Sequence, residues 1–419
     1  MNRAAIGAAL GAFALAGAVL AIGADTTPTN LDSRRLFGLW RARHVLAAVA
    51  LIVVGIAYLA RARSRDAFRS VLAGTATVCI ALGALEGLGR AGLIPWQKIF
   101  APGFGDLGAL GTAPVPNQDV KGVSRKDTAS VWGIPSEPIA FHYRTDRRGF
   151  RNVPDRETAD VHLIGDSVLV GALVPFEQTL VARLESMLAQ PVLQTALINT
   201  APQTMIGHFK NAGFDLRDRL VLQFVFEGND LGDTAALEPE RAASIAAIVE
   251  SKSLFDHAWR LLASVSEPTL GVARTRSCTI GPRTYTFFWA AEHFAGYETQ
   301  GQAITRALET FGAELQAQGA RYAVVIVPTK LRVLGPLCPQ WPPGSDLTDW
   351  RRHLSPLRDQ VLAWGRDRGV PVLDLTPALE AAASAGTIPW FDTDTHWNEH
   401  GHEAAARAIA QWDVVRRKQ

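Results

Sequence analysis

Leu163-Ile164-Gly165-Asp166-Ser167-Val168-Leu169-Val170-Gly171 is the stretch of sequence that decides the fold of this chain. The apolar run from Val161 to Ile164 stops at Gly-Asp-Ser, and apolar residues then resume. This pattern predicts a buried parallel strand that ends in a tight turn and is followed by a helix. Ligands bind at the carboxyl ends of strands in open α/β sheets, so Ser167 stands where a nucleophile would act. Taken alone, the motif is also compatible with an ordinary turn serine.

Strand-like and helix-like patterns alternate around this stretch, from Phe141 to the C-terminus. Such alternation predicts an α/β domain whose parallel sheet is covered by helices on both faces. The expected strands are Val161–Ile164, Val192–Ile198, Leu220–Phe226, Tyr322–Val327 and Val372–Leu375. The expected helices are Gln178–Leu188, Met205–Asp218, Gln302–Gln318, Leu357–Arg368 and Glu399–Trp412. Residues of about 233–295 interrupt the alternation, and we expect a mostly helical insertion there.

The first ninety residues have a different composition. The apolar segments are Ala4–Ala24, Val45–Ala60 and Val71–Leu88. Crossing the hydrocarbon core takes roughly 20 apolar residues, so we expect three transmembrane helices. The first segment could instead be a cleaved signal peptide, but the two apolar segments that follow favour its retention. The expected organisation is a membrane anchor over residues 1–92, a linker or lead-in over 93–140 and a catalytic domain over 141–419.

The arginines of the short loops predict the orientation in the membrane. Four of them crowd the loop between the second and third apolar segments, at positions 61, 63, 65 and 69. Short loops rich in Lys and Arg remain cytoplasmic, so the third helix should exit the cytoplasm and place everything after Gly92 outside it. The expected location is the inner membrane, with the catalytic domain in the periplasm. A second group of arginines, at positions 34, 35, 41 and 43, lies between the first and second apolar segments. The predicted orientation places this loop outside the cytoplasm, so these arginines are evidence against it.

The overall composition excludes several classes of function. The 419 residues carry a formal net charge of only +2, whereas a dedicated nucleic-acid binder would show a strongly basic face. No Walker-type phosphate loop and no zinc-spaced cysteine pair occurs in the sequence. We therefore expect no nucleic-acid partner, no cofactor and no bound metal.

Three further short polar motifs supply the residue types that a serine nucleophile needs as partners. Asn199-Thr200-Ala201 follows the second strand, Gly228-Asn229-Asp230 follows the third, and Asp394-Thr395-His396 precedes the last helix. His396 is the candidate base, and Asp394 can orient it because residues two apart in an extended loop point to the same side. The candidate oxyanion donors are Asn229 and the backbone N–H groups of Ser167 and Ala201.

In these blocks and in their order, the chain resembles the SGNH (GDSL-type) hydrolases from about Phe141 to the C-terminus. It is most similar to the membrane-linked branch of alginate and other exopolysaccharide O-acetylation proteins. That branch shows a lead-in like residues 143–151 (Tyr-Arg-Thr-Asp-Arg-Arg-Gly-Phe-Arg), a Val-Pro-Thr-Lys run like residues 327–330, and an Asp-x-His-Trp block like residues 394–397. The resemblance implies a flavodoxin-like fold and an esterase or acyltransferase that acts through a serine-bound acyl group.

Two positions depart from the family pattern. Ala201 stands where the family usually has a glycine oxyanion donor, although the backbone N–H survives that change if φ is negative. Many relatives place the acid three residues before the histidine, a position that Thr393 occupies here. The acid is therefore expected to be Asp394, with Asp392 as the competing candidate.

The sequence thus predicts a membrane-anchored serine esterase or O-acyltransferase that acts on a cell-surface or exported polysaccharide. Its expected partners are an acylated glycan or acyl donor, membrane lipid, and other polysaccharide-export or acetylation proteins. The alternative is a non-catalytic glycan-binding or assembly subunit that keeps the fold. A metal site built from Asp392, Asp394 and the histidines 396, 400 and 402 is a weaker alternative, because no His-Glu-x-x-His pattern occurs.

Cys278 and Cys338 are the two cysteines outside the apolar N-terminal segments. In an oxidising compartment they can form a disulfide that joins the insertion to the loop after the fourth strand. Two unpaired thiols are the alternative, and the sequence does not decide between them.

Overall fold

A computed structural model describes residues 3–23, 35–36, 40–94, 114–124, 126–127, 136–198, 200–237, 252–255, 258–259, 262, 275–288, 298–338 and 354–416. The chain divides into two compact units. The first comprises Met1–Pro102 and Ser244–Val272, and the second comprises Gly103–Ala243 and Ala273–Gln419.

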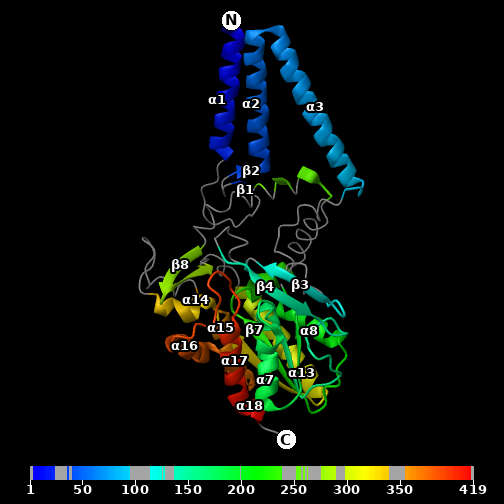
Figure 1. Cartoon of the computed structure of the whole chain (residues 1–419), viewed down its shortest axis with the longest axis vertical. Coiled ribbons are helices and arrows are strands. Elements are labelled where there is room, and N and C mark those ends of the chain that lie inside the picture. The colour runs from blue at the N-terminus through cyan, green and yellow to red at the C-terminus, as the bar shows by residue number, and fades with distance from the viewer. Residues whose placement is uncertain are drawn as a thin grey trace. The chain divides into compact units, whose positions relative to one another are not determined.

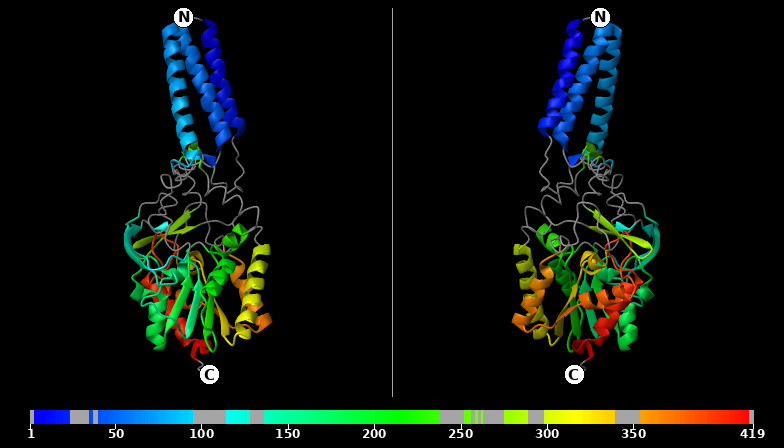
Figure 2. Two further views of the ribbon diagram at one scale, coloured as in Figure 1. Left: turned by 90° about the vertical axis from the view of Figure 1, so that its right-hand side faces the viewer. Right: turned by 90° about the vertical axis from the view of Figure 1, so that its left-hand side faces the viewer.

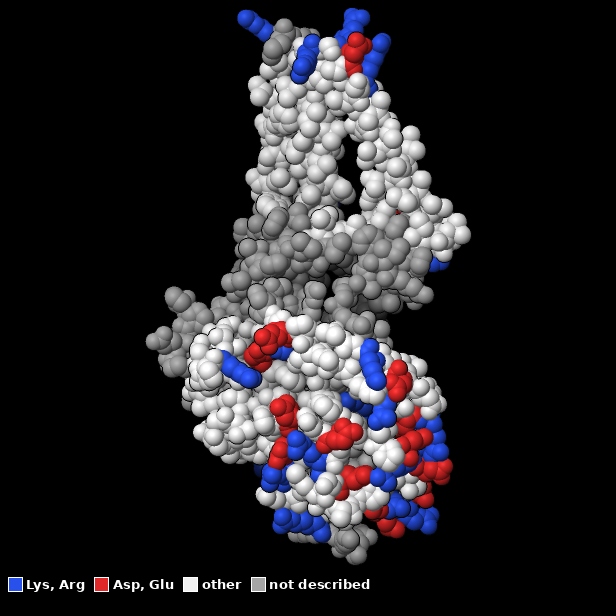
Figure 3. All heavy atoms as spheres, viewed as in Figure 1, with Lys and Arg blue, Asp and Glu red and all other residues white. Residues whose placement is uncertain are grey.

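Three long helices dominate the first unit (Figure 1). They are α1 (Arg3–Gly23), α2 (Ala42–Arg63) and α3 (Arg65–Arg90), and a two-residue bridge of β1 (Arg35–Leu36) with β2 (Trp40–Arg41) lies between the first two. All three helices are long and apolar enough to cross a membrane, as the sequence predicted, with mean hydropathies of 2.3, 2.3 and 1.8. Along the face that Figure 3 shows, charged side chains stand near the helix ends and the stretches between are uncharged.

Small residues allow α1 and α2 to pack closely. Ala9 and Ala16 of α1 and Ala48 of α2 are buried. Gly55 lies so near the Phe13 ring that a Cβ atom there would come within 2.6 Å of it. Small residues at such contacts are typical of helices that pack in a bilayer, where backbone approach replaces the hydrophobic effect as the source of association.

A five-stranded parallel sheet forms the centre of the second unit. Its spatial order is β11-β10-β7-β5-β6, which in chain order is the 2-1-3-4-5 arrangement of flavodoxin-like folds. The strands are β5 (Val161–Gly165), β6 (Val192–Ala196), β7 (Leu220–Phe226), β10 (Arg321–Val327) and β11 (Val372–Asp374). The predicted α/β class and flavodoxin-like sheet are therefore confirmed.

Helices cover both faces of this sheet (Figure 2). Neighbouring residues such as Leu163 and Ile164 enter different apolar clusters, because side chains alternate between the faces of a strand. One face packs against α7 (Leu180–Leu188), α16 (Thr376–Ser384) and α17 (Glu399–Gln411). The other packs against α8 (Pro202–Asn211), α13 (Glu298–Ala317) and α15 (Leu357–Arg368). Shorter helices complete the unit: α6 (Ser167–Val170), η1 (Phe176–Gln178), α9 (Asp230–Ala236), α14 (Lys330–Leu334), η3 (Gly335–Leu337) and α18 (Asp413–Arg416).

Two antiparallel hairpins differ from the expected organisation. The predicted lead-in contains β3 (Asp119–Ser124), which pairs with β4 (Ile139–Arg144). Within the insertion predicted to be mostly helical, β8 (Thr275–Ile280) pairs with β9 (Arg283–Phe288). Threonine and aromatic residues favour strands, and Tyr285 and Phe287 bury one face of the second hairpin. Residues 238–251 of the insertion lie outside the described residues.

Of the two alternatives for Cys278 and Cys338, the structure has the disulfide, which joins Cys278 of β8 to Cys338 after η3. The largest error in a predicted helix boundary is in α8, which ends at Asn211, seven residues before the predicted end. Gly213 follows with a φ of +67°, a conformation that interrupts a helix and that glycine adopts without strain.

Candidate active site

The turn after β5 places Ser167 at the start of α6. Asp166 caps this helix, because its carboxylate accepts the Val168 N–H at 3.1 Å. A Cβ atom on Gly165 would lie 2.9 Å from the Leu169 side chain, so the tight turn requires a glycine there. Ser167 remains half-buried, while Asp166 and Val168 are buried. The local sequence thus presents the hydroxyl at the carboxyl edge of the sheet.

Hydrogen bonds join Ser167, His396 and Asp394 in a chain. The Ser167 Oγ lies 2.8 Å from His396 Nε2, and His396 Nδ1 lies 2.6 Å from Asp394 Oδ1. The same Asp394 oxygen accepts the His396 backbone N–H at 2.8 Å. Burial disfavours the charge on Asp394, but the adjacent imidazole and these hydrogen bonds hold its pKa below the ordinary value. An ionised carboxylate only accepts, so Nδ1 carries the proton and Nε2 is left to accept the serine proton.

The predicted oxyanion donors follow three neighbouring strands of the sheet. Ser167 follows β5, Ala201 lies between β6 and α8, and Asn229 lies between β7 and α9. Ala201 has a φ of −68°, so alanine is accommodated there without strain. Asp233 accepts one N–H of the Asn229 amide at 2.7 Å and thereby fixes which way the amide faces. The second N–H of that nitrogen is the one an oxyanion would use.

The competing acid, Asp392, has a different partner. It forms a salt bridge of 2.5 Å with Lys126, and although burial opposes the charge, Lys126 holds the pKa of Asp392 below its usual value. Thr393 pairs with the Ser136 hydroxyl at 2.6 Å. Of the two candidate carboxylates, Asp394 is the one that contacts His396.

A buried lysine holds the loop that carries His396. Lys330 Nζ donates to the carbonyl oxygens of Phe391, Asp392 and Asp394 at 2.7, 2.5 and 3.2 Å. Burial lowers the pKa of Lys330 to about 7, against the opposing effect of the surrounding carboxylates. The sequence contained this lysine in a motif, but its contacts with the loop depend on the tertiary structure.

Two tryptophans lie at the two ends of the loop that carries His396 and pair with each other. Trp390 and Trp397 are buried and form a backbone bridge across the base of residues 391–396. Both indoles belong to the apolar core of the unit, so neither offers a surface on which a sugar could stack.

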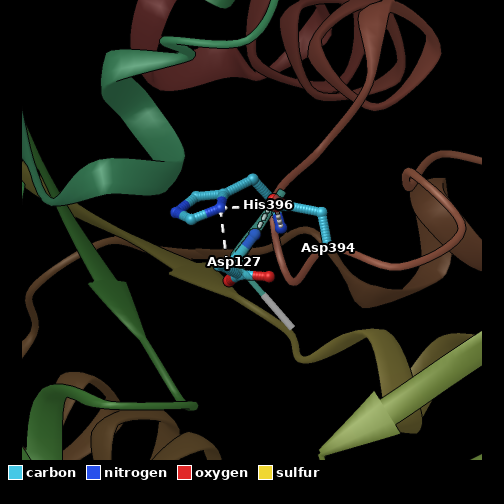
Figure 4. Close-up of side chains that lie close together, drawn as sticks. All are labelled: Asp127, Asp394 and His396. Carbon is cyan, nitrogen blue, oxygen red and sulfur yellow. Dashed lines mark hydrogen bonds and ion pairs between the residues drawn. The ribbon is translucent and has the colours of Figure 1, made fainter. Parts of the chain in front are cut away.

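A second carboxylate at His396, that of Asp127, was missed by sequence reasoning. Asp127 comes from the lead-in segment, and its Oδ2 lies 3.6 Å from His396 Nδ1 (Figure 4). It also accepts the Thr395 N–H at 2.9 Å and the Thr395 hydroxyl. More than 260 residues separate Asp127 from this loop in the sequence, so no spacing pattern could reveal the contact.

The charges around His396 alter its acidity. Burial favours the neutral imidazole, but the carboxylates of Asp394, Asp127 and Asp166 outweigh it and raise the pKa of His396 to about 9. Behind the serine, burial raises the pKa of Asp166 to about 6 and that of Asp233 to about 7, the latter with a contribution from Asp166. These shifted groups gather where a proton would be transferred, as is common in active sites.

One group in the described part of the chain has the geometry to hold a metal ion. The ligand atoms of Asp127, Asp394 and His396 lie within 4.8 Å of one another. All four carboxylate oxygens already accept protons from Thr395, His396 or the Asp127 N–H. His402 is directed elsewhere, because its Nδ1 accepts the Leu180 N–H. The donor set therefore fits an acid–imidazole pair better than a cation.

The lead-in motif at residues 143–151 supports the turn that carries the serine. The buried Arg151 guanidinium donates to the carbonyls of Val170, Gly171 and Val174, at 3.0, 2.5 and 2.8 Å. Asp146 arranges the motif by accepting the backbone N–H groups of residues 148 and 150. An arginine here gives several buried carbonyls a charged donor.

Comparisons with known proteins give matches to parts of this chain. Residues 287–418 match the family described as the SGNH hydrolase-like domain of the acetyltransferase AlgX. This segment contains Asp394 and His396, whereas Ser167 and Asn229 precede it. A "Probable alginate O-acetylase AlgJ" of Pseudomonas putida is 34% identical over 97 residues, which are 23% of this chain and 23% of that protein.

Two solved structures resemble this chain weakly. The acetyl xylan esterase AlAXEase has 10% identity and a TM-score of 0.35, with coverage of 59% of this chain and 96% of the esterase. A lipase/acylhydrolase from Enterococcus faecalis has 16% identity and a TM-score of 0.32, with coverage of 61% and 95%. These values describe only weak overall similarity. Together with the sheet order, the AlgX and AlgJ matches support a similarity of this chain to SGNH hydrolases related to alginate O-acetylation.

Proposed function

We propose that this protein is a serine esterase or O-acyltransferase that removes or transfers acyl groups, most simply acetyl, on a cell-surface or exported polysaccharide. The observation that carries the proposal is the hydrogen-bonded chain from Ser167 through His396 to Asp394. A hydroxyl, an imidazole and a buried carboxylate in this order are what acyl transfer through serine requires.

The first half of the reaction forms an acyl-serine. His396 Nε2 takes the Ser167 proton as Oγ attacks the ester carbonyl, and Asp394 stabilises the imidazolium through Nδ1. The negative charge on the carbonyl oxygen is met by Asn229 and by the N–H groups of Ser167 and Ala201. The imidazolium then returns its proton to the departing alcohol as the C–O bond breaks.

The second half of the reaction transfers the acyl group to an acceptor. His396 removes a proton from water or from a sugar hydroxyl, which attacks the acyl-serine, and the proton returns to Ser167 Oγ as that bond breaks. Water as acceptor makes the enzyme an esterase, and a sugar hydroxyl makes it a transferase. The names of the AlgX and AlgJ relatives support acetyl as the acyl group and a polysaccharide as the substrate.

We place the protein in a membrane, held by α1, α2 and α3, with the catalytic unit outside the cytoplasm. Three helices of sufficient length and hydropathy support the anchoring, and the arginines at the end of α2 and the start of α3 support the orientation. Proteins of polysaccharide export or acetylation are then the expected partners, since the substrate would be modified during or after export.

The test uses the purified full-length chain with two kinds of substrate. Incubation with O-acetylated polysaccharide should release acetate, and addition of an unacetylated acceptor glycan should divert acetyl groups to it if the enzyme is a transferase. Mass spectrometry of the trapped intermediate should find the added acetyl on Ser167. Binding of the polysaccharide without any acyl-serine, release or transfer would instead identify a glycan-binding subunit.

A further inference from the structure

Asp127 forms three hydrogen bonds with the loop that carries His396, and each joins it to a different group. Its Oδ1 accepts the Thr395 N–H at 2.9 Å, its Oδ2 accepts the Thr395 hydroxyl, and its own N–H donates to Asp394 Oδ2 at 2.7 Å. Its Oδ2 also stands 3.6 Å from His396 Nδ1. Figure 4 shows both carboxylates directed toward the same edge of the ring.

Asp394 uses its two oxygens in a complementary way. Oδ1 binds His396, through the ring and the backbone, whereas Oδ2 binds the Asp127 N–H. Asp127 therefore holds the orientation of the first acid with its backbone and approaches the imidazole with its side chain. Besides bonding Thr395, the Asp127 carboxylate lies within 4 Å of Nδ1, a distance at which opposite charges interact strongly.

The other charges around the ring come from several segments. They are Asp394 in the loop itself, Asp166 after β5, Lys330 at the start of α14, and the Lys126–Asp392 salt bridge. Each lysine is bonded to the loop, Lys330 through backbone carbonyls and Lys126 through Asp392. Lys330 and Asp127 also attract each other electrostatically, so the Asp127 carboxylate acts on Lys330 as well as on His396.

We infer that Asp127 is a second acid of this site, a positioning residue that fixes Asp394 and shares with it the stabilisation of the His396 imidazolium. The inference rests on the proposed serine chemistry for its functional meaning. It assigns a role to the lead-in segment, which brings the second carboxylate to a site whose other members follow the strands of the sheet or precede α17. A site with two acids tolerates the loss of one better than a site with a single acid.

The experiment measures the titration of His396 directly, by histidine-selective ¹⁵N NMR of the full-length protein in detergent. His396→Gln identifies the signal. Asp127→Asn removes the charge and keeps the shape, Asp127→Ser provides a second uncharged variant should the first fail to fold, and Asp127→Glu restores the charge. Asp119→Asn is the matched control, because Asp119 lies in the same segment and is exposed.

Both uncharged variants should lower the His396 midpoint by about one pH unit, the size expected when an opposite charge beside a titrating group is lost. Asp127→Glu should recover part of the shift, and Asp119→Asn should leave the midpoint at the wild-type value. A midpoint that stays at the wild-type value in Asp127→Asn and Asp127→Ser would overturn the inference.

Kinetics supply the second readout, through kcat/KM for an aryl acetate. Asp394→Asn should cost less than the roughly 10⁴-fold loss known for a lone acid. The double variant Asp394→Asn/Asp127→Asn should be at least about tenfold less active than Asp394→Asn, because neither acid then remains. Equal activity of the single and double variants would contradict a shared role. If the wild type shows no serine chemistry, the proposed function fails, whereas the NMR midpoint still decides the role of Asp127.

Discussion

Ser167 contributes one half-buried hydroxyl to the fold, and its hydrogen bond to His396 is the contact that matters for chemistry. Ser167→Ala should therefore lower turnover of an aryl acetate by about four orders of magnitude or more while leaving the melting temperature close to that of the wild type. Ser186→Ala, on the exposed face of α7, is the control and should keep full activity. Near wild-type turnover by Ser167→Ala would exclude the serine mechanism.

His396 predicts the pH dependence of the reaction. Only the neutral imidazole can accept the serine proton, and its pKa is raised to about 9. At pH 7 about one molecule in a hundred therefore has a functional base, and kcat/KM should rise roughly tenfold per pH unit until it levels off near pH 9. A pH–rate profile that is already level at pH 7 would show that the carboxylates around the ring do not hold the proton in solution.

Asp394 and Asp392 occupy the same loop and differ in what they contact. Asp394 binds His396, whereas Asp392 binds Lys126. Asp394→Asn should lower kcat/KM at least about tenfold more than Asp392→Asn, because only the first change alters the partner that fixes the imidazole tautomer. The two isosteric variants control for each other, and the reverse order of severity would identify Asp392 as the acid.

At the scale of elements, the β8–β9 hairpin supports the loop that carries the candidate base. Thr286 of β9 donates its N–H to the Asp392 carbonyl at 2.9 Å. The rings of Tyr285 and Phe287 lie within 6 Å of Lys330 Nζ, which binds three carbonyls of the same loop. The disulfide then joins this hairpin to Cys338, shortly after the helix that begins at Lys330.

Removal of the disulfide should therefore weaken stability and activity together. Its ends are separated by 60 residues, and a loop of that length corresponds to about 4 kcal/mol in the chain-entropy model. Cys338→Ser should lower the midpoint of urea unfolding and reduce kcat, since the hairpin contacts of the loop loosen. Cys79→Ser, which changes a cysteine without a disulfide partner in α3, should alter neither quantity. Unchanged kcat in Cys338→Ser would show that the loop does not depend on the hairpin.

At the scale of the whole molecule, the chain combines an apolar helical unit with an α/β unit, and the orientation of the first determines where the second can work. The arginines at the adjoining ends of α2 and α3 predict that this turn is cytoplasmic and that the C-terminus is outside. A reporter active only outside the cytoplasm, fused after Gln419, should be active, and a cytoplasmic reporter at the same position should be silent. The opposite pattern would remove the basis for modification of an exported glycan.

The sequence by itself determined the sheet, the apolar helices and most of the residues of the candidate site. Each strand and helix carries its own periodicity, so β5, β7 and α15 were predicted to within one residue of their bounds. Ser167, Asn229, Asp394 and His396 could be named because strand ends and short motifs are local features of the chain. Local patterns also failed where two structures compete, as in the hairpin of residues 275–288, because short alternating segments are ambiguous without their packing partners.

The tertiary structure alone decided which groups surround the histidine. Asp127 contacts the loop although more than 260 residues separate them in the sequence. Lys330, which lies shortly after the end of β10, contacts it as well. Such contacts arise when the sheet and its covering helices pack, and no periodicity or spacing records them. For the choice between Asp392 and Asp394, the sequence favoured Asp394 only through its spacing of two residues from His396, and the contacts come from the tertiary structure. Packing separates them, because it places Lys126 against one carboxylate and the imidazole against the other.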